Sequence, residues 1–303
     1  MASPPRWFTA ITKALSLPEN KGQIIYQIAT VDSNNTPHVR SQVHRGIVIP
    51  DEAPYLPVML TTTDIRTPKV VQMLSNPNVE IAWWMQGSQD QFRVSGRVHL
   101  VPHPIDAARH TLDSSRFIAL AKMQTQGFDW EKKRLEVFDA MSPRMKAGWC
   151  VPPPGSVIPS YEEAKKWPTE VAKLGEAQSE EERKNQEEAL RNFVLIFVEP
   201  FEVDWAQLAT NPNRRTKFKL DGEKWVEELV VPARACFAAL RERITSSLKL
   251  LIYVEHMAIA RRQTTSIAVR CFPTFNSMSS AYTQSTIWPQ RALFEGGTGS
   301  SIN

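Results

Sequence analysis

Hydroxyl and ammonium side chains gather where the sequence predicts the start of a short helix. Thr62 and Thr63 end a predicted strand, and Thr67, Pro68 and Lys69 follow within six residues. A helix N-terminus presents unpaired backbone N–H groups and a partial positive charge, so it binds phosphate. The hydroxyls and the Lys69 ammonium add further donors for phosphate oxygens. The segment therefore predicts a phosphate site, although a capped helix with a solvent-exposed lysine fits the same residues.

A second polar pair lies on a predicted strand. Gln91 and Arg93 alternate with Phe92 and Val94, so both polar side chains point to one face. The Gln91 amide offers a donor and an acceptor together, which suits the edge of an imide-like ring. The plainer interpretation is the polar outer face of a half-buried strand.

Arg40 is a further candidate for phosphate binding. It stands at the turn end of a strand predicted for residues 38–49. Its guanidinium fork suits a phosphate, although a lone arginine is usually a surface residue. The argument for a site is that several phosphate-suited groups fall on neighbouring strands.

Other chemistries lack their residue patterns. The six histidines show no paired metal-ligand spacing, and Pro102 and Pro104 prevent a helix that would align His99 with His103. The chain contains no Gly-x-Ser-x-Gly nucleophile turn and no glycine loop of the two common nucleotide-binding types. We therefore expect no metal site, and we identify no catalytic residue.

The order of these segments resembles the pyridoxamine 5'-phosphate oxidase family, and most closely its FMN-binding split-barrel branch. The resemblance rests on residues 37–46, 63–69, 76–80 and 91–96, with the same spacing from Lys69 to Gln91. The end of this region resembles the closing segment of the family, with Trp205, Arg215 and Trp225 followed by Pro232. The similarity covers about residues 5–232.

The resemblance implies which side chains would hold the cofactor FMN. Arg40 and Lys69 would bind its phosphate, and Thr62 and Thr63 would add contacts there. Pro68 stands where the family often has arginine, so one phosphate donor is missing.

The resemblance also implies contacts to the flavin ring. Gln91 would meet the ring edge, and Trp205 and Arg215 would lie over or beside the ring, from a second subunit. It thus implies a homodimer with FMN at the subunit interface.

The substrate side departs from the family, which binds the substrate phosphate with Lys, Tyr, Arg and Ser. The aligned positions here are Arg45, Phe138, Ser142 and Lys146. Arg45 and Lys146 keep a positive charge, so we expect them to bind a small-molecule substrate. Phe138 lacks the hydroxyl, Ser142 lacks the guanidinium fork, and residues 211–213 replace an Arg-x-His segment. Oxidation of vitamin B6 phosphates is therefore an open question.

The elements that must position these residues are mostly strands. Apolar alternation and turn signals predict strands at 23–31, 38–49, 57–63, 79–85, 92–101, 193–198, 201–205, 215–220 and 225–230. Helical spacing predicts helices at 4–17, 67–75, 105–121 and 130–140, with parts of 162–191. Consecutive short strands with tight turns indicate an antiparallel barrel or sandwich. With the resemblance, the expected fold is mainly β with flanking helices, an antiparallel split β-barrel.

Charge and composition narrow the class of protein. The 303 residues have a net charge of +4, but residues 233–303 carry eight basic and three acidic side chains. The first 232 residues therefore have a net charge of −1, which argues against a nucleic-acid partner. We expect 5–232 to be the FMN-binding domain and 233–303 to be a C-terminal extension outside the fold. Three scattered cysteines and no apolar stretch of about 20 residues predict a cytoplasmic protein without a membrane segment.

Two functions remain open at this stage. The first is an FMN-dependent oxidoreductase, an oxidase or a reductase, that transfers hydride through flavin N5. The second is a non-catalytic protein that uses the split barrel to hold FMN or heme. An enzyme needs an open, polar-lined cavity beside N5, so that cavity would discriminate between them.

Overall fold

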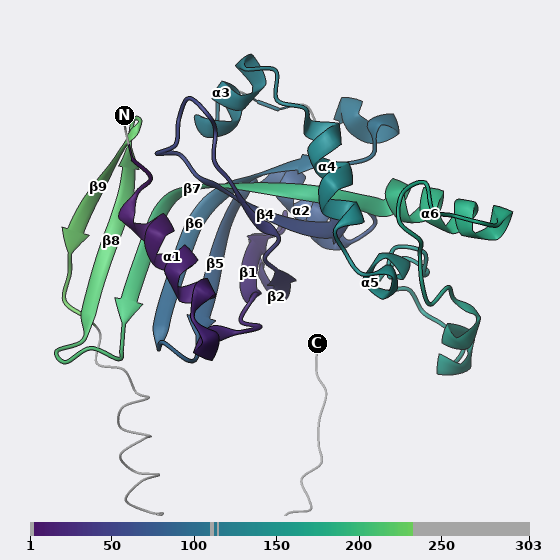
Figure 1. The fold of residues 1–303 in the computed structure, drawn as a ribbon, viewed down its shortest axis with the longest axis horizontal. Helices are drawn as coiled ribbons and strands as arrows, with labels where there is room; N and C mark the ends of the chain where they lie inside the picture. Colours follow the sequence, from purple (N-terminus) through teal and green to yellow (C-terminus); the bar gives the residue numbers. More distant parts are fainter. Residues whose placement is uncertain (1–2, 110–111, 114, 233–303) are drawn as a thin grey trace, which may run out of the picture. The chain divides into compact units, whose positions relative to one another are not determined.

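A nine-stranded antiparallel sheet forms the centre of the protein. The computed structural model describes residues 3–109, 112–113 and 115–232 (Figure 1). The strands run in the order β2-β1-β5-β6-β7-β4-β3, with β8 on β7 and β9 on β8. Their bounds are β1 Ile25–Val31, β2 Pro37–Val43, β3 Gly46–Val48, β4 Val58–Asp64, β5 Asn78–Met85, β6 Asp90–Val101, β7 Phe193–Gln207, β8 Arg214–Asp221 and β9 Lys224–Leu229.

Helices flank both faces of the sheet. They are α1 Arg6–Ser16, α2 Pro68–Ser75, α3 Ala119–Thr125, α4 Trp130–Asp139, α5 Pro143–Ala147 and α6 Glu180–Asn192. Short 3-10 helices occupy Pro18–Asn20, Pro104–Arg109 and Tyr161–Lys166. None of the helices within the described ranges has the length and apolar character needed to cross a bilayer.

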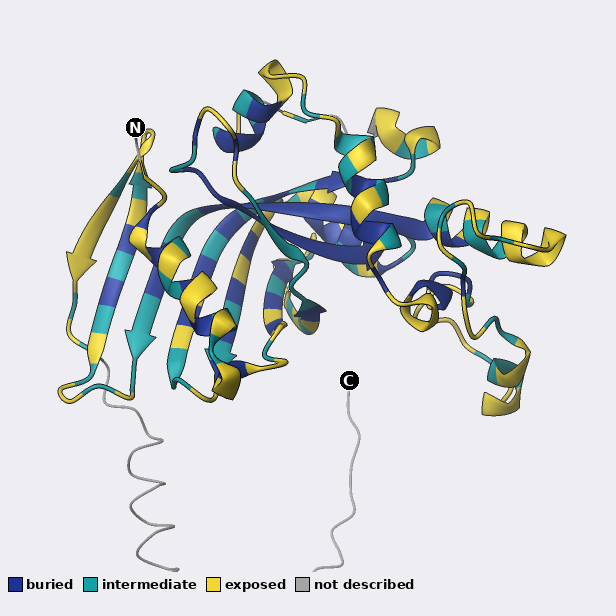
Figure 2. Ribbon diagram, viewed as in Figure 1, coloured by how far each residue is buried: buried dark blue, intermediate teal, exposed yellow. Residues whose placement is uncertain are grey.

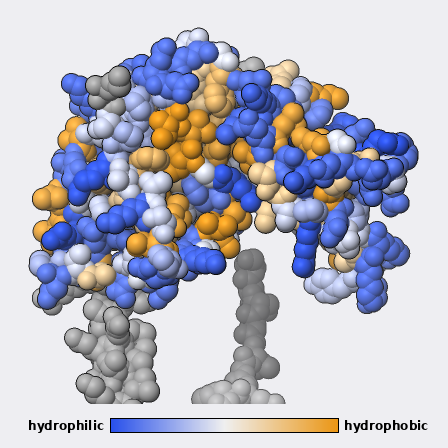
Figure 3. Space-filling view, in the orientation of Figure 1, coloured by the Kyte–Doolittle hydropathy of each residue, from blue (hydrophilic) through white to orange (hydrophobic). Residues whose placement is uncertain are grey.

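The alternation of side chains along β7 explains how two cores share one sheet. Val194, Ile196 and Val198 pack with α1 and α2 in one apolar cluster. Phe193 and Leu195 point the other way and pack with residues of α3 to α6 in a second cluster. The first half of β7 is therefore buried on both faces, as Figure 2 shows. On the surface, hydrophilic residues surround a hydrophobic area near the middle of the visible face (Figure 3).

The sheet is open at a seam between β2 and β4. The strand predicted for residues 38–49 is broken, because the chain leaves β2 at Val43 and begins β3 at Gly46, which has a φ of 124°. β2 pairs with β1, whereas β3 pairs with β4. Side chains bridge the seam: Gln42 Nε2 donates to the Thr62 carbonyl at 2.6 Å, and Thr61 Oγ1 donates to the Val43 carbonyl at 2.8 Å. The expected antiparallel split barrel is thus confirmed, with its sheet not closed.

Most predicted elements are confirmed, and one helix is wrong. The helices predicted for 4–17, 67–75 and 130–140 correspond to α1, α2 and α4. The helix predicted for 105–121 is not continuous in the described part of that range, where a 3-10 helix ends at Arg109 and α3 begins only at Ala119. Asp113 accepts hydrogen bonds from the Ser115 backbone and hydroxyl, a local turn that competes with helix. The prediction for residues 233–303 falls outside the described residues.

Candidate functional site

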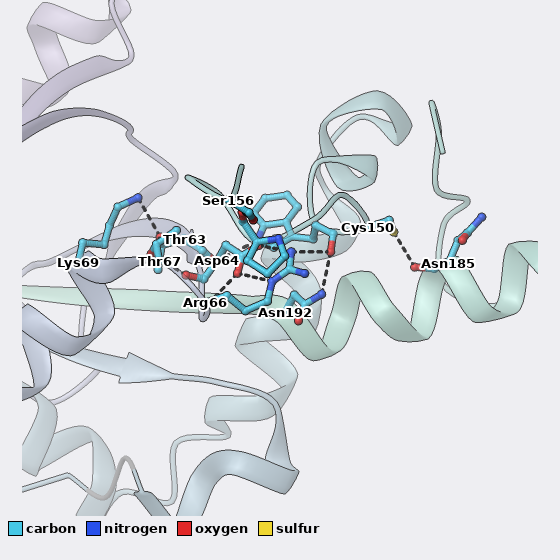
Figure 4. Close-up of polar contacts among 11 residues, drawn as sticks. Thr63, Asp64, Arg66, Thr67, Lys69, Cys150, Ser156, Asn185 and Asn192 are labelled. Carbon is cyan, nitrogen blue, oxygen red and sulfur yellow. Dashed lines mark hydrogen bonds and ion pairs between the residues drawn. The ribbon is translucent and has the colours of Figure 1, made fainter. Parts of the chain in front are cut away.

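Lys69 and Thr63 meet at the junction of β4 and α2. Lys69 lies in the first turn of α2, and its Nζ donates to Thr63 Oγ1 at 3.0 Å. The Thr67 hydroxyl lies 3.3 Å from the same Thr63 oxygen. Figure 4 shows these three side chains pointing toward one another. The structure therefore brings together Thr63, Thr67 and Lys69 of the predicted phosphate site, whereas the Thr62 hydroxyl lies beside Arg45.

Thr67 does not cap α2 in the predicted way. It occupies the position before the helix, but its side chain makes no capping hydrogen bond. The Thr67 hydroxyl instead donates to the Asp64 carbonyl at 2.7 Å. The hydroxyl thus stabilises the turn before the helix, and the first turn of α2 is left without a side-chain cap.

Arg40 belongs to the same cluster through α2 and β1. Its Nη1 donates to Thr30 Oγ1 at 2.6 Å, and its Nη2 donates to Gln72 Oε1 at 3.0 Å. The Thr30 hydroxyl also donates to Gln72 Oε1, at 2.6 Å. Arg40 Nη1 also donates to the Ile28 carbonyl, at 3.4 Å. All three acceptors of Arg40 are uncharged, so Arg40 keeps its positive charge uncompensated.

The positive charge of Arg40 affects the pKa of Lys69. Burial, and then the positive charge of Arg40, lower the pKa of Lys69, while Asp64 opposes that change. Asp64 is itself occupied by Arg66, whose Nε and Nη2 donate to its two oxygens at 3.0 and 2.7 Å. Within the described part of the chain, neither Arg40 nor Lys69 forms an ion pair. Two half-buried like charges with neutral partners are the donor set that a phosphate dianion requires.

Sequence reasoning missed Thr30 and Gln72, which complete this cluster. Gln72 stands three residues after Lys69, a spacing that places both on one side of α2, so helical spacing could have indicated it. Thr30 gave no comparable signal, because it meets Arg40 only through the pairing of β1 with β2.

Arg45 and Thr62 lie beside the seam of the sheet. Thr62 directly precedes Thr63 on β4, so the two side chains point to opposite faces. The Thr62 hydroxyl lies 3.4 Å from Arg45 Nε, and Arg45 Nη2 contacts Met145 Sδ at 2.7 Å. Burial lowers the pKa of Arg45. Arg45 makes no ion pair among the residues that the structure describes, so it is a third cation available to an anionic ligand.

Gln91 and Arg215 share a face of the sheet that we call the open face. It is the face of β5–β8 that points away from α1, whose Trp7 and Ile11 pack with Phe92 on the other side. Gln91 stands opposite Ala206 on β7, and Ala206 stands opposite Arg215 on β8. Paired residues of neighbouring strands project to the same side, so Gln91 and Arg215 both reach the open face.

Trp205 points to the face opposite Arg215. It pairs with Phe92 and Thr216, and its ring stacks on Phe92 with centroids 5.8 Å apart. Its Nε1 donates to Asp90 Oδ1 at 2.9 Å. The structure therefore does not bring Trp205 and Arg215 together within one copy, and neither is joined to Lys69 or Arg40. Their contacts to the flavin ring stay predictions.

Lys146 is buried, and its polar contacts are with Ala172 and Asp139. Its side chain is 0% exposed, and its Nζ donates to the Ala172 carbonyl at 3.1 Å and lies 3.5 Å from Asp139 Oδ1. Phe138, also buried, lies under the ammonium. The Lys146 ammonium is thus enclosed where α4 and α5 pack together. Its hydrogen-bond acceptor, the Ala172 carbonyl, lies 26 positions further along the chain.

Comparison with known proteins finds similarity in sequence and in fold. Residues 4–102 match the family model described as pyridoxamine 5'-phosphate oxidase, FMN-binding domain. A protein of Arabidopsis thaliana named pyridoxine/pyridoxamine 5'-phosphate oxidase 2 is 25% identical over 211 residues, which are 68% of this chain and 86% of that protein. The crystal structure of a pyridoxamine 5'-phosphate oxidase-related, FMN-binding protein from Nostoc punctiforme covers 76% of this chain and 100% of its own, with a TM-score of 0.55 and 21% identity.

The matched region contains the cation cluster. Arg40, Lys69 and their neutral partners Thr30, Thr63 and Gln72 all lie within residues 4–102. Their charge and hydrogen-bond donors fit the phosphate end of FMN. The resemblance is confirmed: this chain is similar to the FMN-binding split-barrel proteins of the pyridoxamine 5'-phosphate oxidase family.

Proposed function

We propose that this protein is an FMN-dependent oxidoreductase whose cofactor phosphate is held by Arg40 and Lys69. The observation that carries the proposal is the pair of half-buried cations with only neutral hydrogen-bond partners. Bound FMN would supply hydride transfer at its N5 atom. Thr63 would orient the Lys69 ammonium, and Gln72 with Thr30 would orient the Arg40 guanidinium.

We further propose a homodimer in the cytoplasm, with FMN at the subunit interface. Among the described residues of one copy, no hydrogen bond joins the predicted phosphate contacts to the predicted ring contacts Gln91 and Arg215, and both of these reach the open face. A second copy would supply Arg215 to the ring, as the resemblance implies, and we propose that it also supplies Gln91, because both side chains reach the open face. The half-exposed polar residues of the open face would then be covered in the dimer.

The proposed substrate is a small anionic molecule bound by Arg45. This guanidinium is half-buried, and its nearest polar partners are the Thr62 hydroxyl and the Met145 sulfur. A bound anion would compensate its charge. The name of the Arabidopsis relative makes vitamin B6 phosphates the first substrates to test.

A non-catalytic FMN- or heme-binding protein is the second candidate. It is favoured by one observation: Phe138 and Lys146, which align with substrate-binding positions of the family, are both buried in the packing of α4 and α5. A protein without turnover would need no further polar groups beside the ring.

Flavin binding can be tested with the purified full-length chain. Visible absorption before and after adding FMN reports uptake, and quenching of FMN fluorescence gives its dissociation constant. We expect the Arg40→Met/Lys69→Met double variant to bind FMN at least a hundredfold more weakly, since each lost charged hydrogen bond is worth about 1.5–3 kcal/mol. Lys13→Met, which removes an exposed lysine of α1, is the control. A wild-type protein that takes up no FMN would refute the proposal.

Turnover is tested separately. Anaerobic titration with pyridoxamine phosphate should bleach the flavin absorption if this substrate is oxidised, and an Arg45→Met variant should need a higher substrate concentration. A flavin that stays oxidised with vitamin B6 phosphates, other anionic substrates and reduced nicotinamides would favour the non-catalytic candidate.

A further inference from the structure

Asp204 is a buried carboxylate between two guanidinium groups on the open face. It lies on β7, and its side chain is 6% exposed. Arg215 on β8 donates to it through Nε at 2.9 Å and Nη2 at 2.6 Å. Arg93, directly opposite Asp204 on β6, donates to the same carboxylate through Nη2. One carboxylate thus holds side chains from both neighbouring strands.

The geometry orients Arg215 in particular. Its two hydrogen bonds to both carboxylate oxygens form the planar fork that fixes a guanidinium in orientation. Burial by itself would raise the pKa of Asp204, but hydrogen bonds from Arg215 and Arg93 outweigh burial and lower it. Asp204 therefore stays ionised and keeps its hold on Arg215.

A neighbouring pair on the same strands shows that this arrangement is specific. Glu202 and Lys217 lie diagonally across β7 and β8 on the open face, but their charged atoms are 3.7 Å apart and both side chains are more than a third exposed. Such a pair contributes little and is free to reorient. Glu202 is therefore a matched control for Asp204.

The cluster keeps a net positive charge, because two guanidinium groups share one carboxylate. Arg93 is 45% exposed and stands two residues from Gln91 on the same face of β6. The N–H groups of Arg93 that Asp204 does not use are available to a partner on the open face. A ligand edge with carbonyl oxygens or negative charge suits these donors.

We infer that Asp204 is a positioning residue of the flavin site, which orients Arg215 toward the ring, and that Arg93 is a further cation of that site. The inference rests on the proposed function, since only that proposal places Arg215 beside the flavin. It adds two residues, Asp204 and Arg93, to the predicted set.

The test measures FMN binding and the visible spectrum of the bound flavin in Asp204→Asn, Arg215→Lys, the double variant, and Glu202→Gln. If Asp204 orients Arg215, Asp204→Asn weakens FMN binding about tenfold and shifts the flavin spectrum. Arg215→Lys should have a similar effect, because lysine cannot form the fork. The double variant should bind no more weakly than either single variant, since both changes remove one interaction. Glu202→Gln should leave both readouts unchanged.

The other possible outcomes refute either the role of Asp204 or the role of Arg93. Unchanged FMN binding by Asp204→Asn would mean that the hold of Asp204 on Arg215 does not matter for the flavin, and tighter binding would mean that the flavin senses only the negative charge of Asp204. Either result would refute the inference. Additive losses in the double variant would also refute it. Arg93→Gln tests the second cation without touching the carboxylate, and wild-type affinity and spectrum would exclude Arg93 from the site. If wild type itself binds no FMN, the proposed function fails. If wild type binds FMN and the Asp204, Arg215 and Arg93 variants bind it equally well, the inference alone fails.

Discussion

The Arg40 guanidinium and the Lys69 ammonium are like charges in one half-buried cluster, and Arg40 contributes to the lowered pKa of Lys69. Their hydrogen-bond partners are hydroxyl and amide oxygens. The folded protein therefore maintains a repulsive pair that a bound phosphate would neutralise. The arrangement therefore lowers the stability of the apoprotein and raises its affinity for a phosphate group.

Removing one charge of this pair should affect the apoprotein and the loaded protein in opposite directions. We expect Lys69→Met to raise the free energy of unfolding of the apoprotein by up to about 1 kcal/mol, because repulsion and desolvation are relieved. The stabilisation on adding FMN should shrink, since it depends on the ratio of ligand concentration to dissociation constant. Thermal unfolding with and without FMN measures both. An apoprotein weakened by Lys69→Met, with the FMN effect intact, would contradict this interpretation.

His44 should make the protein sensitive to mild acid. Its ring packs 4.8 Å from the Trp83 ring, and burial lowers its pKa from 6.5 to about 4. Between pH 6.5 and 4 the unfolded chain binds a proton that the folded protein does not. The free energy of unfolding should therefore fall as pH decreases through this window, by on the order of 3 kcal/mol. Urea unfolding at pH 4.5 and 7 should show this loss, and His44→Gln should reduce it. An equal loss in wild type and variant would assign the effect to other groups.

Glu199 should anchor the start of α3. Its two carboxylate oxygens accept hydrogen bonds from the backbone N–H groups of Ile118 at 2.7 Å and Leu120 at 3.0 Å. Glu199→Ala leaves these donors unpaired in a buried place, so we expect a loss of about 2 kcal/mol in the free energy of unfolding. Glu202→Ala, on the same strand but half-exposed, should change it by less than about 0.5 kcal/mol. Chemical denaturation compares the two, and equal losses would rule out the anchoring role.

The C-terminal segment is open to a direct test. The change in charge and composition after Pro232 predicts that residues 233–303 lie outside the FMN-binding domain. Limited proteolysis of the full chain, followed by mass spectrometry, should give a resistant fragment ending near residue 232 that still binds FMN. A resistant fragment that includes residues 233–303 would reject this boundary.

The sequence allowed the strands and most helices to be predicted because their signals are local. Pro68 at the start of a helix and the alternation of Gln91 and Arg93 with apolar residues depend only on near neighbours. The break between β2 and β3 was missed, because a glycine with positive φ and a change of pairing partner interrupt a continuous β-like pattern.

The sequence by itself determined the phosphate-suited residues around Lys69, since a six-residue segment and one helix turn bring them together. Only the tertiary structure decided that Gln72 and Thr30 complete the Arg40 site, that Lys146 is buried, and that Trp205 and Arg215 point to opposite faces. These outcomes depend on strand register and on contacts between distant segments. The physical reason is that one residue of register reverses the face that a strand side chain reaches, and no local pattern specifies the register between segments so far apart.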